Sequence, residues 1–196
     1  VSGGNFSDPA TTPSNLNVNT LVTQLGLSNV TVSTASGLGG NGDITVNNAI
    51  NYSSANSLTL AANRSITVVA GSGGINNAGA GAVTLTGAGA GVIAVNENIT
   101  TNGGTIALTS GTGGVTLAAA KAIDAGSGTI AINSGGGAAN FSSGTLRTSN
   151  ATAAAIGVSN ATTLTLGNVA LSGGGTLSVS HSGAGTQTGG TSISGT

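Results

Sequence analysis

Apolar residues recur along this chain in short alternating runs, separated by Gly, Ser, Thr and Asn. The run GGTIALTSGTGGVTLAAAKAIDAGSGTIAIN, residues 103–133, has apolar positions that mostly alternate with small or hydroxyl residues. Strict alternation over so few residues is typical of short β-strands, and the residues between them are typical of turns. Ile106 and Ile130 are 24 residues apart. This interval is the period of much of the chain.

Three apolar positions recur with a period of this length. The first apolar column contains Ile50, Ile75, Ile99, Ile123, Leu146 and Val169. The second apolar column contains Leu58, Val83, Ile106 and Ile130. A third, looser column contains Ile66, Ile93, Val115, Phe141 and Leu164. We expect these residues to stack in a core that is built from three short strands per coil.

A regular period in this range predicts a solenoid, because one repeat alone cannot bury its apolar face. The Leu-x-x-Leu-x-Leu spacing of a leucine-rich horseshoe is absent, and no segment carries a convincing helical stripe. The pattern therefore predicts an all-β fold, a single-stranded parallel β-helix or β-solenoid with about 24 residues per coil.

The regularity of the pattern divides the chain into three parts. Residues 1–28 contain both prolines and are expected to form an irregular N-terminal segment. Residues 29–180 are expected to form the parallel β-helix, although the pattern weakens after Ile132. Residues 181–196 have a single apolar anchor and are expected to be a ragged last coil or a linker.

A short helix is predicted inside the N-terminal segment, over residues 20–26. Asn19 or Thr20 is the expected N-cap, and Gly26 is the expected end. A helix of this length that lies across the open end of a solenoid would act as a cap.

Composition narrows the class further. Only 4% of the residues are charged while 38% are hydrophobic, which argues against disorder. Glycine has no three-residue period, so collagen is excluded. The absence of cysteine excludes disulfides, zinc–thiolate sites and a cysteine nucleophile. There is no run of 18 apolar residues, so no transmembrane helix is expected. Because the chain starts at Val1 without Met, we interpret it as a processed product or an excised fragment.

Charge limits the partners. Arg64, Lys121 and Arg147 are the basic residues, and they lie far apart in sequence. Nucleic-acid binding needs a basic stripe that neutralises phosphates, and an anionic membrane needs a basic cluster. We therefore expect neither nucleic acid nor membrane insertion.

Candidate chemistry is sparse. Paired-carboxylate catalysis needs acids that converge on one face, and the acids are Asp8, Asp43, Glu97 and Asp124. The repeat brings Glu97 and Asp124 one coil apart in nearby positions with Lys121 beside them, and an exposed ion pair is the favoured interpretation. His181 has no acid close in sequence. We predict no catalytic residue, no cofactor-binding residue and no metal ligand, and hence no enzyme and no cofactor.

Glycine-rich runs and sequons also have simple interpretations. Residues 71–74 and 87–91 lack the Lys-Ser/Thr of a phosphate loop and are expected to be corners. Residues 39–43 half-match a calcium-binding nonapeptide once, which does not make a metal site. Asn-x-Ser/Thr sequons, only slightly more frequent than composition alone produces, permit glycosylation at Asn5, Asn29, Asn51, Asn63, Asn98, Asn140, Asn150 and Asn160.

One tract resembles a known family. Residues 42–68, GDITVNNAINYSSANSLTLAANRSITV, resemble the repeats of filamentous-haemagglutinin-like, two-partner-secreted bacterial adhesins, and so do residues 21–32. Tyr52 stands where that family often has Trp. The resemblance implies a right-handed β-helix that belongs to the shaft of a very large secreted surface protein. The Asn-Pro-Asn-Gly-type signatures of that family's secretion domain are not visible in this sequence.

Three function classes follow. The first is a structural shaft or fibre segment of a secreted, extracellular bacterial surface adhesin that contributes to cell adhesion, aggregation or biofilm matrix. The second is a carbohydrate- or ice-binding β-solenoid module. Ice binding needs paired threonine ladders, whereas the relevant threonines stand singly between apolar residues at Thr45, Thr59, Thr67, Thr84 and Thr116. The third, a β-helical polysaccharide-active enzyme, lacks an acid cluster.

The expected partners follow from the first two classes. They are neighbouring coils or repeats of the same fibre, self-association end to end or side by side, and a host or bacterial surface glycan.

Overall fold

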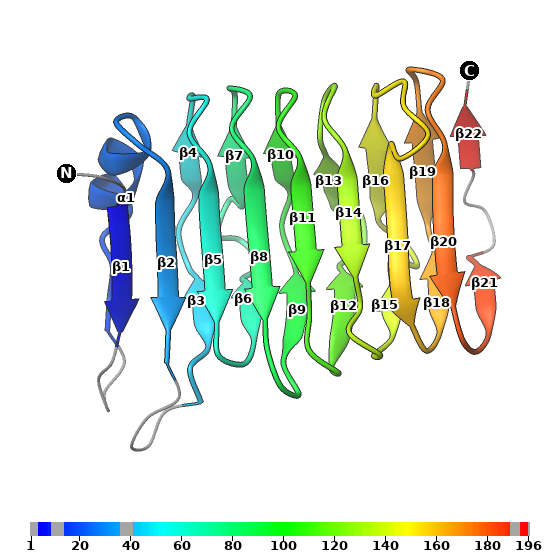
Figure 1. The fold of residues 1–196 in the computed structure, drawn as a ribbon, viewed down its shortest axis with the longest axis horizontal. Coiled ribbons are helices and arrows are strands. Elements are labelled where there is room, and N and C mark those ends of the chain that lie inside the picture. Colours follow the sequence, from blue (N-terminus) through cyan, green and yellow to red (C-terminus); the bar gives the residue numbers. More distant parts are fainter. Residues whose placement is uncertain (1–3, 9–13, 36–40, 189–192, 196) are drawn as a thin grey trace.

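The computed structural model describes residues 4–8, 14–35, 41–188 and 193–195. These residues form a β-solenoid of about six turns with about 24 residues per coil, which confirms the predicted all-β parallel β-helix. In Figure 1 the chain descends in the front strands, ascends behind them and advances to the right, so the coil is right-handed. This is the hand that parallel crossover connections favour.

The described strands build three parallel sheets, which we call sheets I, II and III in the order in which each coil visits them. Sheet I consists of β1 (Gly4–Asp8), β2 (Val30–Thr34), β5 (Leu58–Ala62), β8 (Val83–Gly87), β11 (Ile106–Thr109), β14 (Ile130–Asn133), β17 (Ile156–Ala161) and β20 (Leu177–His181). Sheet II consists of β3 (Ile44–Val46), β6 (Ile66–Val68), β9 (Val92–Val95), β12 (Gly114–Leu117), β15 (Ala139–Asn140), β18 (Leu164–Leu166) and β21 (Gly185–Gln187). Sheet III consists of β4 (Ile50–Tyr52), β7 (Ile75–Asn77), β10 (Ile99–Thr101), β13 (Ala122–Asp124), β16 (Thr145–Thr148), β19 (Asn168–Leu171) and β22 (Ile193–Gly195).

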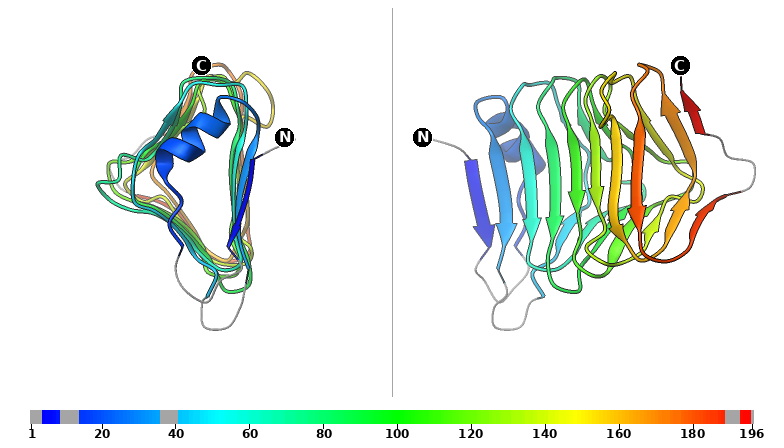
Figure 2. Two further views of the ribbon diagram at one scale, coloured as in Figure 1. Left: turned by 90° about the vertical axis from the view of Figure 1, so that its left-hand side faces the viewer. Right: turned by 45° about the vertical axis from the view of Figure 1, so that its right-hand side comes forward.

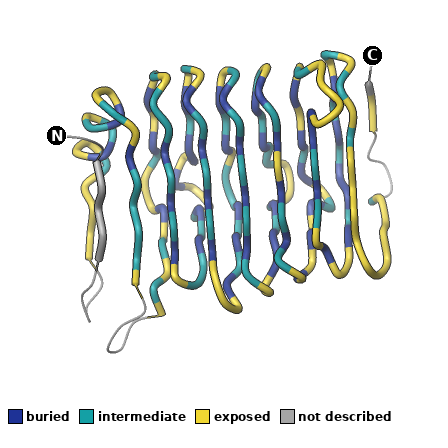
Figure 3. The backbone as a smooth tube through the Cα atoms, viewed as in Figure 1, coloured by how far each residue is buried: buried dark blue, intermediate teal, exposed yellow. Residues whose placement is uncertain are grey.

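The apolar columns lie inside the coil. The first column runs through sheet III, where Ile50 pairs with Ile75 and the stack continues through Ile99, Ile123, Leu146 and Val169. The second column runs through sheet I, where Leu58, Val83, Ile106 and Ile130 stack in register. All of these side chains are buried. Figure 3 shows the result as buried and half-buried residues that alternate along the strands of the middle coils.

The third column, in sheet II, differs from the prediction at one position. Ile66, Ile93 and Val115 stack as expected, but Ala139 follows Val115 and pairs with Leu164. Phe141 is therefore not a member of this column, although it is fully buried. Residues 139 and 141 face the same side of a strand because side chains alternate with period two. The larger side chain, Phe141, was predicted to be the member of this column, and the smaller Ala139 is the one that occupies it.

Tight corners between sheets require glycine at some positions. A Cβ atom added at Gly91 would lie 1.7 Å from the carbonyl oxygen of Arg64 in the preceding coil. Gly114 has φ +87°, which side chains rarely adopt, and an added Cβ would lie 2.1 Å from the oxygen of Ala138. These corners let successive coils approach within hydrogen-bonding distance.

Helix α1 (Val18–Leu25) lies across the N-terminal end of the solenoid. Seen along the rod, the coil is triangular and α1 crosses the triangle (Figure 2, left). Leu21 and Leu25 are buried on its inner face. The corner that follows β4 completes the contact, because Ser54 Oγ and Asn56 Nδ2 donate to the carbonyl oxygen of Leu25 at 2.9 and 2.8 Å.

The helix begins earlier than predicted. Its N-cap is Asn17, not Asn19 or Thr20, because the Asn17 side chain accepts a hydrogen bond from the Asn19 backbone N–H at 2.8 Å. The C-cap is Gly26. An asparagine side chain at this position satisfies one of the N–H groups that the first turn leaves unpaired.

The terminal segments take part in the coil. β1 pairs in parallel with β2, so sheet I extends into the segment that was expected to be irregular. Pro9 and Pro13 lie outside the described residues. Beyond Ile132 the pairing stays in register into β17, and β21 and β22 pair with the coil before them. The expected loss of regularity after Ile132 therefore reflects variable corners and not an end of the strands.

Candidate functional surfaces

The residue beside each buried residue of a strand faces solvent, so the surface also consists of columns. The outward column of sheet III contains, in register, Asn51, Asn76, Thr100, Asp124, Arg147 and Ala170. Asn76 Nδ2 donates to Asn51 Oδ1 at 2.8 Å, and Thr100 Oγ1 donates to Asn76 Oδ1 at 3.0 Å. Arg147 Nε donates to Asp124 Oδ2 at 2.7 Å. These side-chain bonds tie neighbouring coils together outside the backbone ladder.

Ion pairs connect successive coils at three places in the described part of the chain. They join Arg64 to Asp43, Lys121 to Glu97 and Arg147 to Asp124. The Arg64 guanidinium lowers the pKa of Asp43. The Lys121 ammonium, 2.8 Å from the carboxylate, and the Gly71 backbone N–H lower the pKa of Glu97. All three basic side chains of the sequence thus face a carboxylate in an adjacent coil.

The expected proximity of Glu97 and Asp124 does not produce a carboxylate pair. Ile99 pairs with Ile123, so Asp124 lies opposite Thr100, and Glu97 binds Lys121 instead. Asp124 binds Arg147 in the following coil. The two acids therefore belong to two separate ion pairs, whereas a single exposed ion pair was expected from the sequence. Within the described residues, no group of three His, Cys, Asp or Glu side chains is placed to hold a metal ion.

Most of the sequon asparagines are exposed, and several already hold the corners together. Asn29, Asn51, Asn63, Asn98, Asn140 and Asn160 are exposed, and Asn150 is half-buried. The Nδ2 atom, to which a glycan would be attached, donates to Ser127 O at Asn150 and to Asn133 Oδ1 at Asn160. Asn98 uses its Oδ1 atom to accept from Ala122 N. Glycosylation stays a prediction, and the two occupied Nδ2 atoms make Asn150 and Asn160 the weaker acceptors. The side chain of Asn5 lies outside the described residues.

Within the described strands, threonines do not form a continuous paired array. In sheet II, Thr45 pairs with Thr67, but Ala94 interrupts the column before Thr116. In sheet I, Thr59 pairs with Thr84, and Ala107 follows.

The outward column of sheet I changes its character along the rod. It contains Thr31, Thr59, Thr84, Ala107, Ala131 and Gly157 in register. Side chains shorten toward the C-terminal coils, and a shallow depression of about 230 Å³ lies over the short residues, lined by parts of β11, β14, β17 and β20.

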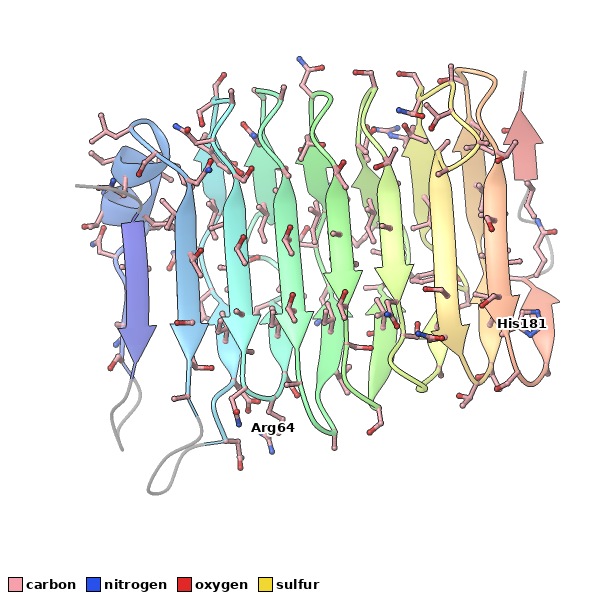
Figure 4. The ribbon with its side chains drawn as sticks, in the orientation of Figure 1. Arg64 and His181 are labelled. Atoms are coloured by element: carbon pink, nitrogen blue, oxygen red, sulfur yellow. The ribbon has the colours of Figure 1, made fainter. Side chains whose placement is uncertain are left out.

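A larger depression of about 740 Å³ adjoins the first and shares Thr109, Asn133 and Ser180 with it. His181 stands at its edge, beside β21 in Figure 4, and the ring Nδ1 lies 2.8 Å from the Gly183 carbonyl oxygen. This surface was not predicted from the sequence. The sequence feature that could have indicated the surface is the change from Thr to Ala and Gly at one outward position of the repeat.

Comparisons with protein-family models, with curated proteins and with solved structures found no match to this chain. None of the described helices is long and apolar enough to span a membrane. The structure supports the coarser part of the family resemblance, a β-solenoid built from repeats. The finer part, an adhesin, stays a proposal.

Proposed function

We propose that this chain is a rigid shaft segment of a large secreted bacterial surface adhesin, located outside the cell. The observation that carries the proposal is the unbroken parallel pairing of all three sheets over about six turns. Each added coil lengthens such a rod by about 4.8 Å, and the backbone ladders on three sides resist bending and unfolding. A shaft of this kind holds a distal binding tip away from the cell and contributes to adhesion, aggregation or biofilm matrix.

The tract that resembles the adhesin repeats supports the proposal. Residues 42–68 contain β3, β4, β5 and β6, which is one full circuit of the coil and the start of the next. The alternating residues of the tract are the ones that fill the core, among them Ile50 and Leu58. The resemblance therefore lies in the positions that build a shaft.

The charged side chains support a structural role without catalysis. Asp43, Glu97 and Asp124 each bind a basic residue of the next coil. At Asp43 and Glu97 the basic partner lowers the pKa, so these two carboxyls are stabilised as anions and are poor general acids. We extend the proposal to partners: neighbouring repeats of the same fibre, with no nucleic acid and no membrane insertion.

Electron microscopy of the native, untruncated protein tests the shaft proposal. We expect long, unbranched and thin rods on cells or in the culture medium. Antibodies raised against this segment should label the rods along their length and not at their tips. Compact particles that carry the antibody label would contradict the proposal.

A further inference from the structure

A second property of this chain lies on the outward face of sheet I, where the two adjoining depressions form one shallow groove. Its floor is formed by the small residues Ala107, Ala131 and Gly157, and the lining comes from β11, β14, β17 and β20. These strands are consecutive along sheet I. The groove therefore follows the rod axis and crosses four strands, a length of about 14 Å.

The lining of the groove combines polar and apolar residues and carries no carboxylate, ammonium or guanidinium group. Its residues are hydroxyl, amide, glycine, alanine and branched aliphatic residues together with His181. A polyanion finds no Lys or Arg in it, and a cation finds no Asp or Glu. The chemistry suits an uncharged molecule with many hydroxyl groups, because hydroxyls bind amides and other hydroxyls while C–H surfaces contact the Ala and Gly floor.

Two amides at the wall of the groove are arranged for such a ligand. Asn160 Nδ2 donates to Asn133 Oδ1 at 3.2 Å, and Asn133 Oδ1 also accepts from Gly135 N at 3.0 Å. Asn133 Nδ2 and Asn160 Oδ1 have no hydrogen-bond partner among the described residues. These two bonded amides thus keep one donor group and one acceptor, and sugar hydroxyls can pair with both.

The backbone at this wall is distorted where the amide projects. The pairing of β17 with β20 shifts register between Val158 and Ala161, and Asn160 has φ +52°, a left-handed conformation. Bulges and left-handed non-glycine residues are enriched next to binding sites, because they re-aim a side chain at some cost in stability. Here the bulge brings the Asn160 amide to Asn133.

From these observations we propose that the groove binds an uncharged oligosaccharide chain that lies along the rod axis. The site is on the side of the shaft, so it goes beyond the structural role proposed above. A shaft with such sites would hold neutral polysaccharide of a matrix or a cell surface along its length, in addition to any contact at a distal tip.

Gly157→Tyr is the central test variant. A Cβ atom added at Gly157 meets nothing within 4 Å, and Gly157 is not among the glycines with positive φ. A tyrosine side chain there fills the groove without disturbing the core, and aromatic residues suit an exposed strand position. Thr84→Tyr is the matched control, because Thr84 belongs to the same outward column but lies outside the groove.

Asn160→Gly is the second variant, and it does not depend on how the first one folds. Glycine adopts the left-handed conformation freely, so the bulge is kept while the amide is lost. Asn51→Ala, in the outward column of sheet III, is its control. Circular dichroism and thermal melting should show that all four variants keep the fold.

Binding is first screened on an array of neutral and sialylated glycans. Isothermal titration calorimetry then measures the affinity for gluco- and chito-tetrasaccharides that bind on the array. We expect neutral glycans to bind the wild-type protein. Gly157→Tyr and Asn160→Gly should each weaken this binding by about tenfold or more, and both control variants should bind as the wild type does. Failure of every neutral glycan to bind, or equal binding by Gly157→Tyr, would overturn the proposal. So would loss of side-by-side rod association in Gly157→Tyr without any glycan binding. None of these results bears on the shaft proposal, because that proposal is tested separately by the electron microscopy of rods.

Discussion

The inner and outer faces of the same strands follow different rules in this protein. On β13, Ile123 is fully buried between Ile99 and Leu146, while its neighbour Asp124 faces solvent and binds Arg147. Every member of the first apolar column, in sheet III, is Ile, Leu or Val, whereas the outer column of that sheet holds amides, a hydroxyl, charges and a methyl group. The inner face therefore determines the fold, and the outer face is free to differ from coil to coil and to acquire function.

A charge on the inner face should have the largest effect. Ile99→Asp places a carboxylate between Ile75 and Ile123, where no partner is available in the apolar stack. Burial of an unpaired charge costs at least several kcal/mol, so we expect loss of cooperative unfolding in a urea titration. Ala170→Asp, on the outer face beside Arg147, is the control, and it should change the free energy of unfolding by less than about 1 kcal/mol. If Ile99→Asp unfolds in urea with the same cooperative curve as the wild type, the assigned register is wrong.

The helical cap should show the next largest contrast. Leu25 is fully buried against the first coil, and Leu27 is 75% exposed two residues later. Leu25→Ala removes buried methyl groups and leaves a cavity, so we expect the free energy of unfolding to fall by about 2–5 kcal/mol. Leu27→Ala should change it by no more than about 0.5 kcal/mol. Equal effects of the two substitutions in chemical denaturation would mean that α1 does not seal the core.

Tyr52 is an exception to the inner-face rule, and its substitution should stabilise the protein slightly. Its hydroxyl is buried and finds no hydrogen-bond partner among the described residues, and burial raises its pKa. Tyr52→Phe removes that unsatisfied group while keeping the ring, so we expect an unchanged or higher melting temperature, with a gain of up to about 1 kcal/mol. Tyr52→Ala, which also removes the ring, should lower it. A clear loss of stability in Tyr52→Phe would reveal a partner of the hydroxyl.

The ion pairs of the outer face should contribute least to the free energy of unfolding, and this contribution should decrease at acid pH. The pKa of Asp43 and that of Glu97 are lowered in the folded protein by Arg64 and Lys121 respectively. A lowered pKa means that the stabilisation is fully present above about pH 4–4.5 and is lost as the pH falls through the folded-state value. We expect a small decrease in melting temperature below pH 4 because both pairs lie at the protein surface, where solvent screens their attraction.

The double variant Asp43→Asn, Glu97→Gln should show a smaller decrease in melting temperature below pH 4 than the wild type. Its melting temperature at pH 7 should be nearly unchanged. An increase in stability on acidification of the wild type would contradict the assignment of these pairs.

The sequence by itself determined the fold class, the period and the members of the first two core columns. The physical reason is that the positions of these columns are apolar in every coil, so the constraint repeats and becomes visible as a period. Burial leaves little choice of residue type at Ile75, Ile99 or Ile123, and spacing alone was enough to align them.

Only the tertiary structure decided which residues meet on the outside and at the corners. It placed Ala139 and not Phe141 in the third column, Asn17 at the helix N-cap, and Lys121 opposite Glu97. It also joined Asn133 and Asn160 beside the groove. Outward residues carry no common requirement for apolarity, and a shift of one or two residues in a corner changes their neighbours. Their contacts therefore depend on the register of packed coils, which the residue pattern of a single strand does not contain.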